Sequence, residues 1–413
     1  MKFDTIIIGG GLSGMTAAIT LAKAGKKVAV INRAQNTLHF NSGSFDLLGY
    51  DAAGNPVTNP LEAIKQLPET HPYAKIGAAN IEALAAEAKQ FLADAGIATY
   101  GQAKANHQRL TPIGALKPAW LTLDGFVHTD EAGKLPAKSV DIVNIEGYLD
   151  LPVDLLADGL QKAGLEVAVR TITTPALEQA RRSPSEMRAS NIALVLANAD
   201  ERQQVAEAIN AIDSKAELLL LPAVLGYKNQ ADVDELVELV HKPMQYVATL
   251  PPSVPGIRIT YQLRKQLQAL GGTFIASDPV VKANYEGGRL VSVETEKLAG
   301  TKFEAQNFIL ATGSFVSHGL VSNYESVSEP ALGLDVYAPG THKDWSVDYL
   351  FDAQPYMEFG VLTDSTFHAL KDGKPLPNVY AIGSVLSGHN SIKQADGTGV
   401  SLLTALAVAK QLK

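Results

Sequence analysis

The sequence predicts an α/β protein, with a Rossmann-like domain assembled from both ends of the chain and an α/β domain inserted between them. Three observations support this fold class. A strand runs into a glycine turn and a helix at 3–24, two later strands enter glycine-bearing turns at 308–313 and 379–384, and helices alternate with strands over 152–221. Because strand–helix–strand units build parallel sheets, the two chain ends are expected to share one sheet.

The first turn has the glycine spacing of a phosphate-binding loop. It lies between the strand 3–8 and a helix that ends at Gly25, and it consists of Gly9, Gly10, Gly11, Leu12, Ser13 and Gly14. Gly9 permits the tight turn, Gly11 leaves room for a pyrophosphate, and Gly14 lets the helix pack closely on the strand. The first N–H groups of a helix, at the positive end of its dipole, suit a phosphate. The loop therefore predicts a dinucleotide-type cofactor.

The remaining elements follow the apolar pattern and the turn residues. Helices are expected at 78–95, 152–163, 201–212, 260–270 and 400–409, and strands at 28–31, 165–172, 218–221, 273–276, 280–284, 289–294, 308–310 and 379–382. The predicted domains are a discontinuous nucleotide-binding domain of residues 1–60, 250–320 and 375–413, an inserted α/β domain of residues 61–249, and a segment on the substrate or cap side of residues 321–374.

The composition excludes several classes of function. The chain of 413 residues carries 35 Lys and Arg against 43 Asp and Glu, and this net charge of −8 argues against nucleic-acid binding. Cysteine is absent, so disulfides, thiolate metal sites and iron–sulfur clusters are excluded, and an electron carrier has to be organic. None of the nine histidines pairs at metal-ligand spacing, so no metal is predicted. The apolar stretch 218–225 is broken by Pro222 and is too short for a direct membrane span.

Several segments together resemble known flavoproteins. Residues 8–14, 310–313 and 380–383 resemble the corresponding motifs of two-domain flavoproteins of the fumarate reductase and glycerol-3-phosphate dehydrogenase type. Residues 38–48, 107–112, 249–253 and 333–336 resemble more narrowly the family of the B subunit of anaerobic glycerol-3-phosphate dehydrogenases. The resemblance runs nearly end to end.

This resemblance implies an enzyme that oxidises sn-glycerol 3-phosphate to dihydroxyacetone phosphate and passes the electrons to quinone. It also implies two kinds of partner, a second flavoprotein subunit and an iron–sulfur subunit that anchors the complex to the membrane. The expected location is therefore cytoplasmic and peripheral, on the inner face of the cell membrane. The cofactor implied for this subunit is a flavin, conventionally FMN.

The residues leave FAD open as the alternative to FMN. An acidic side chain is expected at the end of the second strand to bind the adenosine ribose of FAD, and this chain has Asn32 and Arg33 there. Asn32 can still hydrogen-bond a ribose, and Arg33 can meet a phosphate or remain a solvated surface charge. The other predicted cofactor-binding residues lie in glycine-bearing turns, and they are Ser42, Gly43, Ser44, Thr312, Gly313, Gly383, Ser384, Gly397, Thr398 and Gly399.

Oxidation of a secondary alcohol needs a base for the hydroxyl proton, and a phosphate needs cations. His39 and His389 are candidate bases because the ordinary pKa of histidine lies near physiological pH. Arg109 and Arg258 are candidates for a substrate phosphate because a guanidinium donates two parallel hydrogen bonds, and Arg258 is also counted in the catalytic group. The alternatives are loop histidines bonded to backbone and arginines in surface ion pairs.

Three competing functions stay open at this stage. An NAD(P)H-dependent flavoprotein reductase of the two-nucleotide type needs a second glycine fingerprint and commonly a cysteine pair, and the sequence has neither. A non-catalytic electron-relay subunit binds flavin but has no substrate pocket. A dehydrogenase that uses nicotinamide alone leaves the motifs at 310–313 and 383 without a purpose.

Overall fold

The computed structural model describes all 413 residues of the chain. The chain divides into two compact units. Unit 1 comprises Met1–Thr37, Asp46–Ala95 and Leu263–Lys413, and unit 2 comprises Leu38–Phe45 and Gly96–Gln262. The predicted segment 321–374 lies in unit 1 by this division. No helix combines the length and the apolar character that a membrane crossing requires.

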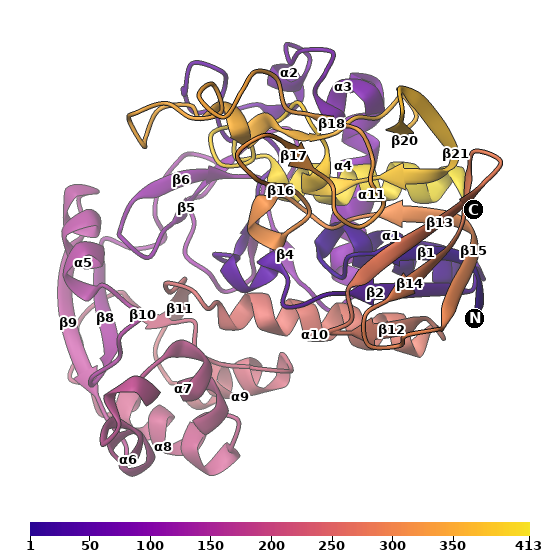
Figure 1. Cartoon of the computed structure of the whole chain (residues 1–413). Coiled ribbons are helices and arrows are strands. Elements are labelled where there is room, and N and C mark those ends of the chain that lie inside the picture. The colour runs from indigo at the N-terminus through magenta and orange to yellow at the C-terminus, as the bar shows by residue number, and fades with distance from the viewer. The chain divides into compact units, whose positions relative to one another are not determined.

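Unit 1 is built on a mixed eight-stranded sheet (Figure 1). Its path is β12-β2-β1-β15-β14-β13, and β21 pairs with β15 and with β20. The strands are β1 (Lys2–Ile8), β2 (Val28–Asn32), β12 (Thr273–Ala276), β13 (Val280–Glu286), β14 (Arg289–Thr295), β15 (Lys302–Leu310), β20 (His368–Lys371) and β21 (Lys374–Ala381). The strands β12, β2, β1, β15 and β21 pair in parallel. The predicted α/β fold class, with a sheet drawn from both chain ends, is confirmed.

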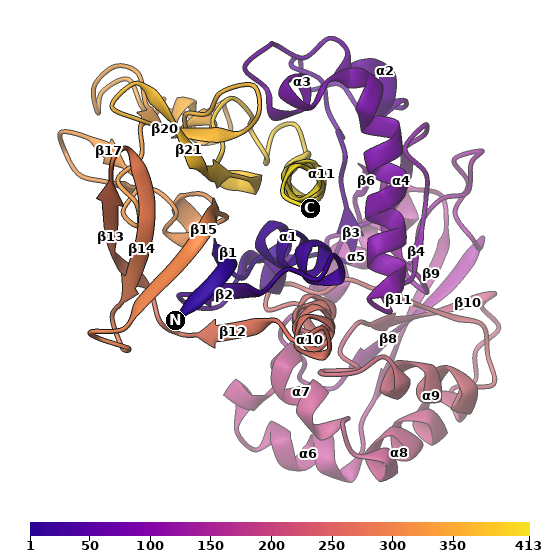
Figure 2. The same ribbon diagram turned by 90° about the vertical axis from the view of Figure 1, so that its right-hand side faces the viewer.

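Parallel pairing explains the uninterrupted apolar sequence of the central strands. Ile6, Ile7 and Ile8 in β1 are all buried, because helices and strands cover both faces of a parallel sheet. The helices α1 (Leu12–Lys23) and α11 (Gly397–Gln411) lie against each other next to these strands (Figure 2). Gly25, with φ +80°, ends the first helical segment as predicted, and its N–H donates to the carbonyl oxygen of Ala22.

Unit 1 has further helices and short strands. They are α2 (Pro60–Ile64), α3 (Pro72–Ile76), α4 (Ala78–Asp94), β16 (Val321–Ser322), β17 (Val327–Ser328), β18 (Val336–Tyr337) and β19 (Gly360–Val361). Helix α11 packs on α3 and α4 as well as on α1.

Helix α10 (Val254–Ala269) begins in unit 2 and ends in unit 1. The sequence predicted its start at 260, and this was wrong because Pro255 and Gly256 looked like a turn. Proline is tolerated in the first turn of a helix, where its missing N–H has no helical partner. Gly256 is required for close contact, since a Cβ atom there would lie 1.7 Å from the carbonyl oxygen of Leu38.

Unit 2 contains a four-stranded parallel sheet in the order β11-β10-β8-β9. Its strands and helices are β8 (Ser139–Ile145), β9 (Glu166–Ile172), β10 (Leu218–Pro222), β11 (Met244–Val247), α5 (Val153–Lys162), α6 (Pro175–Arg181), α7 (Ala189–Val195), α8 (Ala199–Asn210) and α9 (Ala231–Leu239). Two small antiparallel sheets accompany it, made of β3 (Ser44–Phe45), β4 (Thr99–Tyr100) and β7 (Leu121–Leu123), and of β5 (His107–Leu110) and β6 (Leu116–Ala119).

Candidate functional site

Three glycine motifs meet at one edge of the sheet in unit 1. The strands β1, β15 and β21 are parallel neighbours, with Ile8 opposite Leu310 and Leu310 opposite Ala381, so the turns that follow them lie together. A Cβ atom on Gly9 would lie 2.2 Å from the carbonyl oxygen of Ala311, and one on Gly383 would lie 2.5 Å from Oγ of Ser13. Ligands of open α/β sheets bind at the carboxyl ends of the strands, which is where this edge lies.

Of the four glycines of the first loop, Gly9, Gly10 and Gly14 are closely packed, and Gly11 faces open space. Gly9 has φ +115°, and a Cβ atom on Gly14 would lie 1.9 Å from the carbonyl oxygen of Gly9. Gly11 has φ −79°, and the nearest atom to a Cβ there is Cβ of Asn36, at 3.9 Å. No side chain caps the N-terminus of α1. The space at Gly11 and the uncapped helix N-terminus fit a phosphate group.

Substituting Gly14 by alanine is expected to lower the free energy of unfolding by about 1–3 kcal/mol, because the added methyl group forces backbone atoms apart. Gly11→Ala is the control in the same loop, since its negative φ and open surroundings accept a methyl group. Urea unfolding of both variants without flavin measures the difference. Equal stabilities would contradict the close packing at Gly14.

Two asparagines hold the loop at Gly10. Oδ1 of Asn32 accepts a hydrogen bond from the N–H of Gly10 at 3.1 Å, and its Nδ2 donates to the carbonyl oxygen of Ala34 at 2.7 Å. Nδ2 of Asn36 donates to the carbonyl oxygen of Gly10 at 3.2 Å. Arg33 is exposed. The role of Asn32 and Arg33 toward a cofactor stays a prediction, and Asn36 is a loop contact that the sequence interpretation missed.

In the later motifs, Thr398 and Gly399 are hydrogen-bonded to the backbone of Asp46, whereas the hydroxyl of Thr312 has no partner. Oγ1 of Thr398 accepts from the N–H of Asp46 at 2.6 Å, and the N–H of Gly399 donates to the carbonyl oxygen of Asp46 at 2.9 Å. Oγ1 of Thr312 is buried and has no hydrogen-bond partner. Since buried hydroxyl groups are normally hydrogen-bonded, this atom is available to a bound ligand beside the glycine loop.

A buried carboxylate in unit 1 bridges two histidines. Oδ2 of Asp396 lies 2.9 Å from Nε2 of His71, and Oδ1 lies 3.1 Å from Nδ1 of His389. His71 and Asp396 are 0% exposed, and His389 is 4% exposed. Burial alone would raise the pKa of Asp396, but the charge and hydrogen bonds of His389 and His71 outweigh burial and hold that pKa well below its usual range. Of these residues, the sequence singled out only His389.

The carboxylate that bridges the two histidines directly precedes, in the sequence, the predicted cofactor-binding residues of α11. Asp396 precedes Gly397, Thr398 and Gly399, and His389 lies in the connection between Gly383 and α11. Both residues therefore belong to a segment bounded on each side by predicted cofactor contacts. No group of three or more acidic or histidine side chains in the structure is placed to hold a metal ion.

A second polar cluster lies in unit 2 and contains Arg109. Nε and Nη1 of Arg109 and Nδ1 of His107 are buried without hydrogen-bond partners. Nε2 of His107 lies 2.6 Å from Oγ1 of Thr122, and the rings of Tyr100 and His128 stack with their centroids 3.9 Å apart. Burial, followed by the nearby His128 and Arg109, lowers the pKa of His107 to about 4. The unsatisfied N–H donors at Nε and Nη1 of Arg109 fit an oxyanion such as a phosphate.

The other predicted residues of unit 2 lie in structured surroundings. Nη1 of Arg258 donates to the carbonyl oxygens of Leu225 and Gly226 at 2.8 and 3.2 Å, and burial lowers the pKa of Arg258 to about 10. His39 is half-buried, which lowers its pKa, and its carbonyl oxygen accepts from the N–H of Ser253 at 2.7 Å. The catalytic or phosphate-binding roles of His39 and Arg258 stay predictions.

The segment 42–44 is also part of unit 2. Ser44 pairs with Thr122 of β7, and Gly43 has φ +81°. A Cβ atom on Gly43 would lie 2.7 Å from the ring of Phe126. The backbone of this segment is thus closely packed, and its cofactor contact stays a prediction together with that of Ser42.

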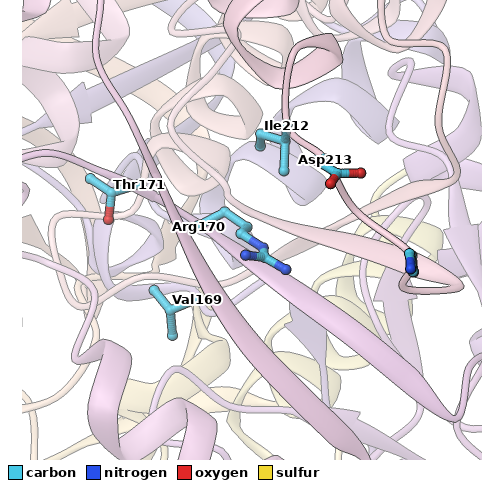
Figure 3. Close-up of a pocket in the computed structure, with 6 residues that line it drawn as sticks. Val169, Arg170, Thr171, Ile212 and Asp213 are labelled. Atoms are coloured by element: carbon cyan, nitrogen blue, oxygen red, sulfur yellow. The ribbon is translucent and has the colours of Figure 1, made fainter.

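A surface hollow on unit 2 contains none of the predicted site residues (Figure 3). It is lined by Val169, Arg170, Thr171, Ile212, Asp213 and Lys215. Nε of Arg170 lies 3.0 Å from Oδ2 of Asp141, so this guanidinium already has a carboxylate partner. We assign this hollow no function.

The chain is similar to flavoproteins along its whole length. A family model described as an FAD binding domain matches residues 4–400. Over its whole length the chain is 41% identical to the B subunit of the anaerobic glycerol-3-phosphate dehydrogenase of Yersinia enterocolitica, and the match covers 98% of that protein. It is 38% identical to the protein of the same name from Pectobacterium carotovorum, and this match covers 99% of that protein. The crystal structure of 3-ketosteroid Δ1-dehydrogenase from Sterolibacterium denitrificans is 11% identical with a TM-score of 0.44, over 100% of this chain and 99% of that one.

Proposed function

Because the chain belongs to the family of the B subunit of anaerobic glycerol-3-phosphate dehydrogenase, within the flavoproteins that carry an FAD-binding domain, we propose that it oxidises sn-glycerol 3-phosphate to dihydroxyacetone phosphate. It is a flavin-dependent oxidoreductase. The electrons pass through partner subunits to a quinone in this proposal. The partners are a second flavoprotein subunit and an iron–sulfur subunit at the inner face of the cell membrane, and the name of the relatives as one subunit of an enzyme supports a multi-subunit complex.

The observation that carries the proposal is the meeting of three glycine motifs at the carboxyl ends of β1, β15 and β21. The open space at Gly11, the uncapped N-terminus of α1 and the unpartnered Oγ1 of Thr312 are all features that a bound dinucleotide would use. We therefore assign FAD as the cofactor. The match to an FAD-binding domain supports FAD and lends no support to the FMN that the sequence resemblance implied.

In this assignment different residues of the chain bind the cofactor, take up the proton and bind a phosphate. When bound, the flavin supplies the acceptor for the two electrons that leave the secondary alcohol as a hydride. The backbone at Gly9 to Gly14 binds the pyrophosphate, and the amide of Asn32 holds that loop through Gly10. Within unit 1, His389 is the group that takes the hydroxyl proton. Within unit 2, the unpartnered Nε and Nη1 of Arg109 are a separate candidate for binding a phosphomonoester.

Two measurements on the purified chain test the proposal. Mass identification of the released cofactor is expected to return FAD rather than FMN. Anaerobic addition of sn-glycerol 3-phosphate to the flavin-loaded chain is then expected to bleach the flavin absorbance, with glycerol as the unphosphorylated control. Bleaching by NADH or NADPH alone would favour the reductase alternative, and bleaching only when partner subunits are added would favour the electron-relay alternative.

Replacing Arg109 by leucine is expected to weaken binding of glycerol 3-phosphate roughly 10- to 100-fold, because one charge-assisted hydrogen bond contributes about 1.5–3 kcal/mol. Arg109→Lys keeps the charge but lacks the planar guanidinium. Its dissociation constant for glycerol 3-phosphate should lie between those of the unmodified chain and Arg109→Leu. Isothermal titration of the flavin-loaded chain measures the dissociation constant.

Arg170→Leu is the matched control for this prediction, since that arginine lies in the same unit and pairs with Asp141. The control should bind glycerol 3-phosphate as the unmodified chain does. An unchanged dissociation constant in Arg109→Leu would remove Arg109 from the phosphate site.

A further inference from the structure

We propose that Asp396 and His71 are positioning residues that hold His389 in the one tautomer able to accept a proton at Nε2. The proposal rests on the proposed function, because it names the groups behind the base that oxidation of the alcohol needs. Its support is the chain of contacts His71–Asp396–His389, buried within unit 1 and standing before the N-terminus of α11.

His71 has only one possible arrangement of its ring proton. Its Nδ1 accepts a hydrogen bond from the N–H of Tyr73 at 3.1 Å, where His71 caps α3. A backbone N–H is always a donor, so Nδ1 carries no proton and the neutral ring carries its proton on Nε2. That nitrogen faces Oδ2 of Asp396 at 2.9 Å and therefore donates to it.

Asp396 then determines the tautomer of His389. An ionised carboxylate is an acceptor only, so Nδ1 of His389, at 3.1 Å from Oδ1, has to donate. The neutral ring of His389 consequently keeps its lone pair on Nε2. A carboxylate behind an imidazole also stabilises the imidazolium that forms once the ring takes up a proton.

The proton transfer balances with the oxidation. The O–H bond of the substrate alcohol breaks, and its proton moves to Nε2 of His389. The electron pair left on oxygen would form the carbonyl as the C–H electron pair leaves with the hydrogen as a hydride, for which a bound flavin would supply the two-electron acceptor. Asp396 stays ionised throughout, and His71 keeps its proton.

The surroundings supply no competing cation at Asp396. The ionisable groups that act on Asp396 are His389 and His71, and the neighbouring Tyr73 is itself acted on by Asp396 and Asp46. The hydroxyl of Tyr73 donates to the carbonyl oxygen of Leu47 at 2.7 Å, and burial, followed by the charges of Asp396 and Asp46, raises the pKa of Tyr73 well above its ordinary value. Tyr73 therefore stays neutral, and one negative charge serves both imidazole rings.

Because the ring proton of His71 is fixed on Nε2, a substitution of Asp396 has a predictable effect on the tautomer of His389. In Asp396→Asn the amide has one accepting and one donating end. His71 can only donate, so the amide oxygen turns to His71 and the NH2 group turns to His389. Nδ1 of His389 then has to accept, its proton moves to Nε2, and the ring loses the nitrogen that takes up the substrate proton.

A second substitution should reverse this effect. In His71→Asp the new carboxylate can still accept from the N–H of Tyr73 as a helix cap, and it has no donor to offer to position 396. The double variant His71→Asp/Asp396→Asn therefore lets the NH2 group of position 396 turn to position 71 and its amide oxygen turn to His389, which restores the tautomer with a basic Nε2. A merely structural role for Asp396 would make the double variant worse than either single one.

The experiment uses the full chain with ring-¹⁵N-labelled histidine and the single-turnover rate of flavin reduction by glycerol 3-phosphate as a function of pH. The signals are assigned by their loss in His389→Gln and His71→Gln. The ¹⁵N spectrum distinguishes protonated from unprotonated ring nitrogens and needs no turnover. Asp364→Asn is the matched control, since Asp364 lies 3.3 Å from Nδ1 of His368 outside this cluster.

The expected results separate the proposal from the proposed function. The unmodified chain should show His71 protonated at Nε2 and His389 protonated at Nδ1. Asp396→Asn should move the proton of His389 to Nε2 and slow flavin reduction roughly 10³- to 10⁴-fold. The double variant should regain at least about 10-fold, as expected of coupled neighbours. The control should match the unmodified chain.

An Nε2-protonated His389 in the unmodified chain would overturn the proposal, even if Asp396→Asn failed to fold. A double variant in which flavin reduction is slower than in Asp396→Asn would also overturn the proposal. If glycerol 3-phosphate reduces no flavin while the ring tautomers are as expected, the proposed substrate fails and the positioning of His389 stands.

Discussion

Replacing Gly11 by valine is expected to leave the chain folded and to remove its flavin. The backbone of Gly11 has φ −79° and no protein atom lies closer than 3.9 Å to an added Cβ, so the protein accepts the side chain. The added branches occupy the space in front of the N-terminus of α1, where the proposed pyrophosphate binds. Losing two charge-assisted hydrogen bonds of about 1.5–3 kcal/mol each weakens flavin binding by roughly 150-fold to more than 10⁴-fold.

Flavin content after purification and the dissociation constant on reconstitution measure this effect. Gly11→Ala should show an intermediate loss, because it adds only the first carbon of the same side chain. Ala199→Val adds the same two methyl branches at the exposed start of α8 and should bind flavin normally. A Gly11→Val chain that retains stoichiometric flavin with unchanged affinity would place the cofactor elsewhere.

Replacing Asp396 by alanine is expected to lower the free energy of unfolding at pH 7 by about 3–5 kcal/mol, because two buried hydrogen bonds to a carboxylate are lost. The pKa of Asp396 in the folded chain lies well below the value of about 3.9 in an unfolded chain. The unfolded state therefore binds a proton at a higher pH than the folded state does. The stability that Asp396 contributes is fully present above pH about 4 and is lost progressively as the pH falls below it.

Urea unfolding of both chains between pH 7 and pH 3 measures this dependence. The difference between the unmodified chain and Asp396→Ala should be constant above pH 5 and should shrink below pH 4. Asp364→Asn serves as the control for a more exposed carboxylate beside a histidine, and it should change the free energy of unfolding by at most about 1 kcal/mol. Parallel curves for the unmodified chain and Asp396→Ala over the whole range would show that Asp396 is not bonded as an ion.

Much of unit 1 was predictable because its signals are local. The segment from β1 to β2 contains its own strand, turn and helix, and the packing of Gly14 on Gly9 confirms the reason for that glycine. Short helices such as α6, α7 and α9 escaped prediction because each offers only two or three turns of periodic sequence. The start of α10 was misplaced because a proline and a glycine marked a turn where the helix begins.

The polar clusters were predictable only in part. His389 and Arg109 were proposed for their residue type and their place among turns, whereas His71 and Asp396 were missed. His71 precedes a proline and Asp396 precedes a glycine, so each resembles a cap or turn residue, and 325 positions separate them. The remaining signal was that Asp396 stands immediately before the glycine motif of the last helix.

The sequence by itself determined the fold class and the closely packed glycine turn after the first strand, because apolar periodicity and glycine spacing act between near neighbours in the chain. Only the tertiary structure decided which side chains share protons and charges. Burying a carboxylate between two imidazoles, or two guanidinium nitrogens without a partner, depends on surfaces that distant segments bring together. The low exposure at those places makes hydrogen bonds strong and unpaired groups costly, and no local pattern encodes it.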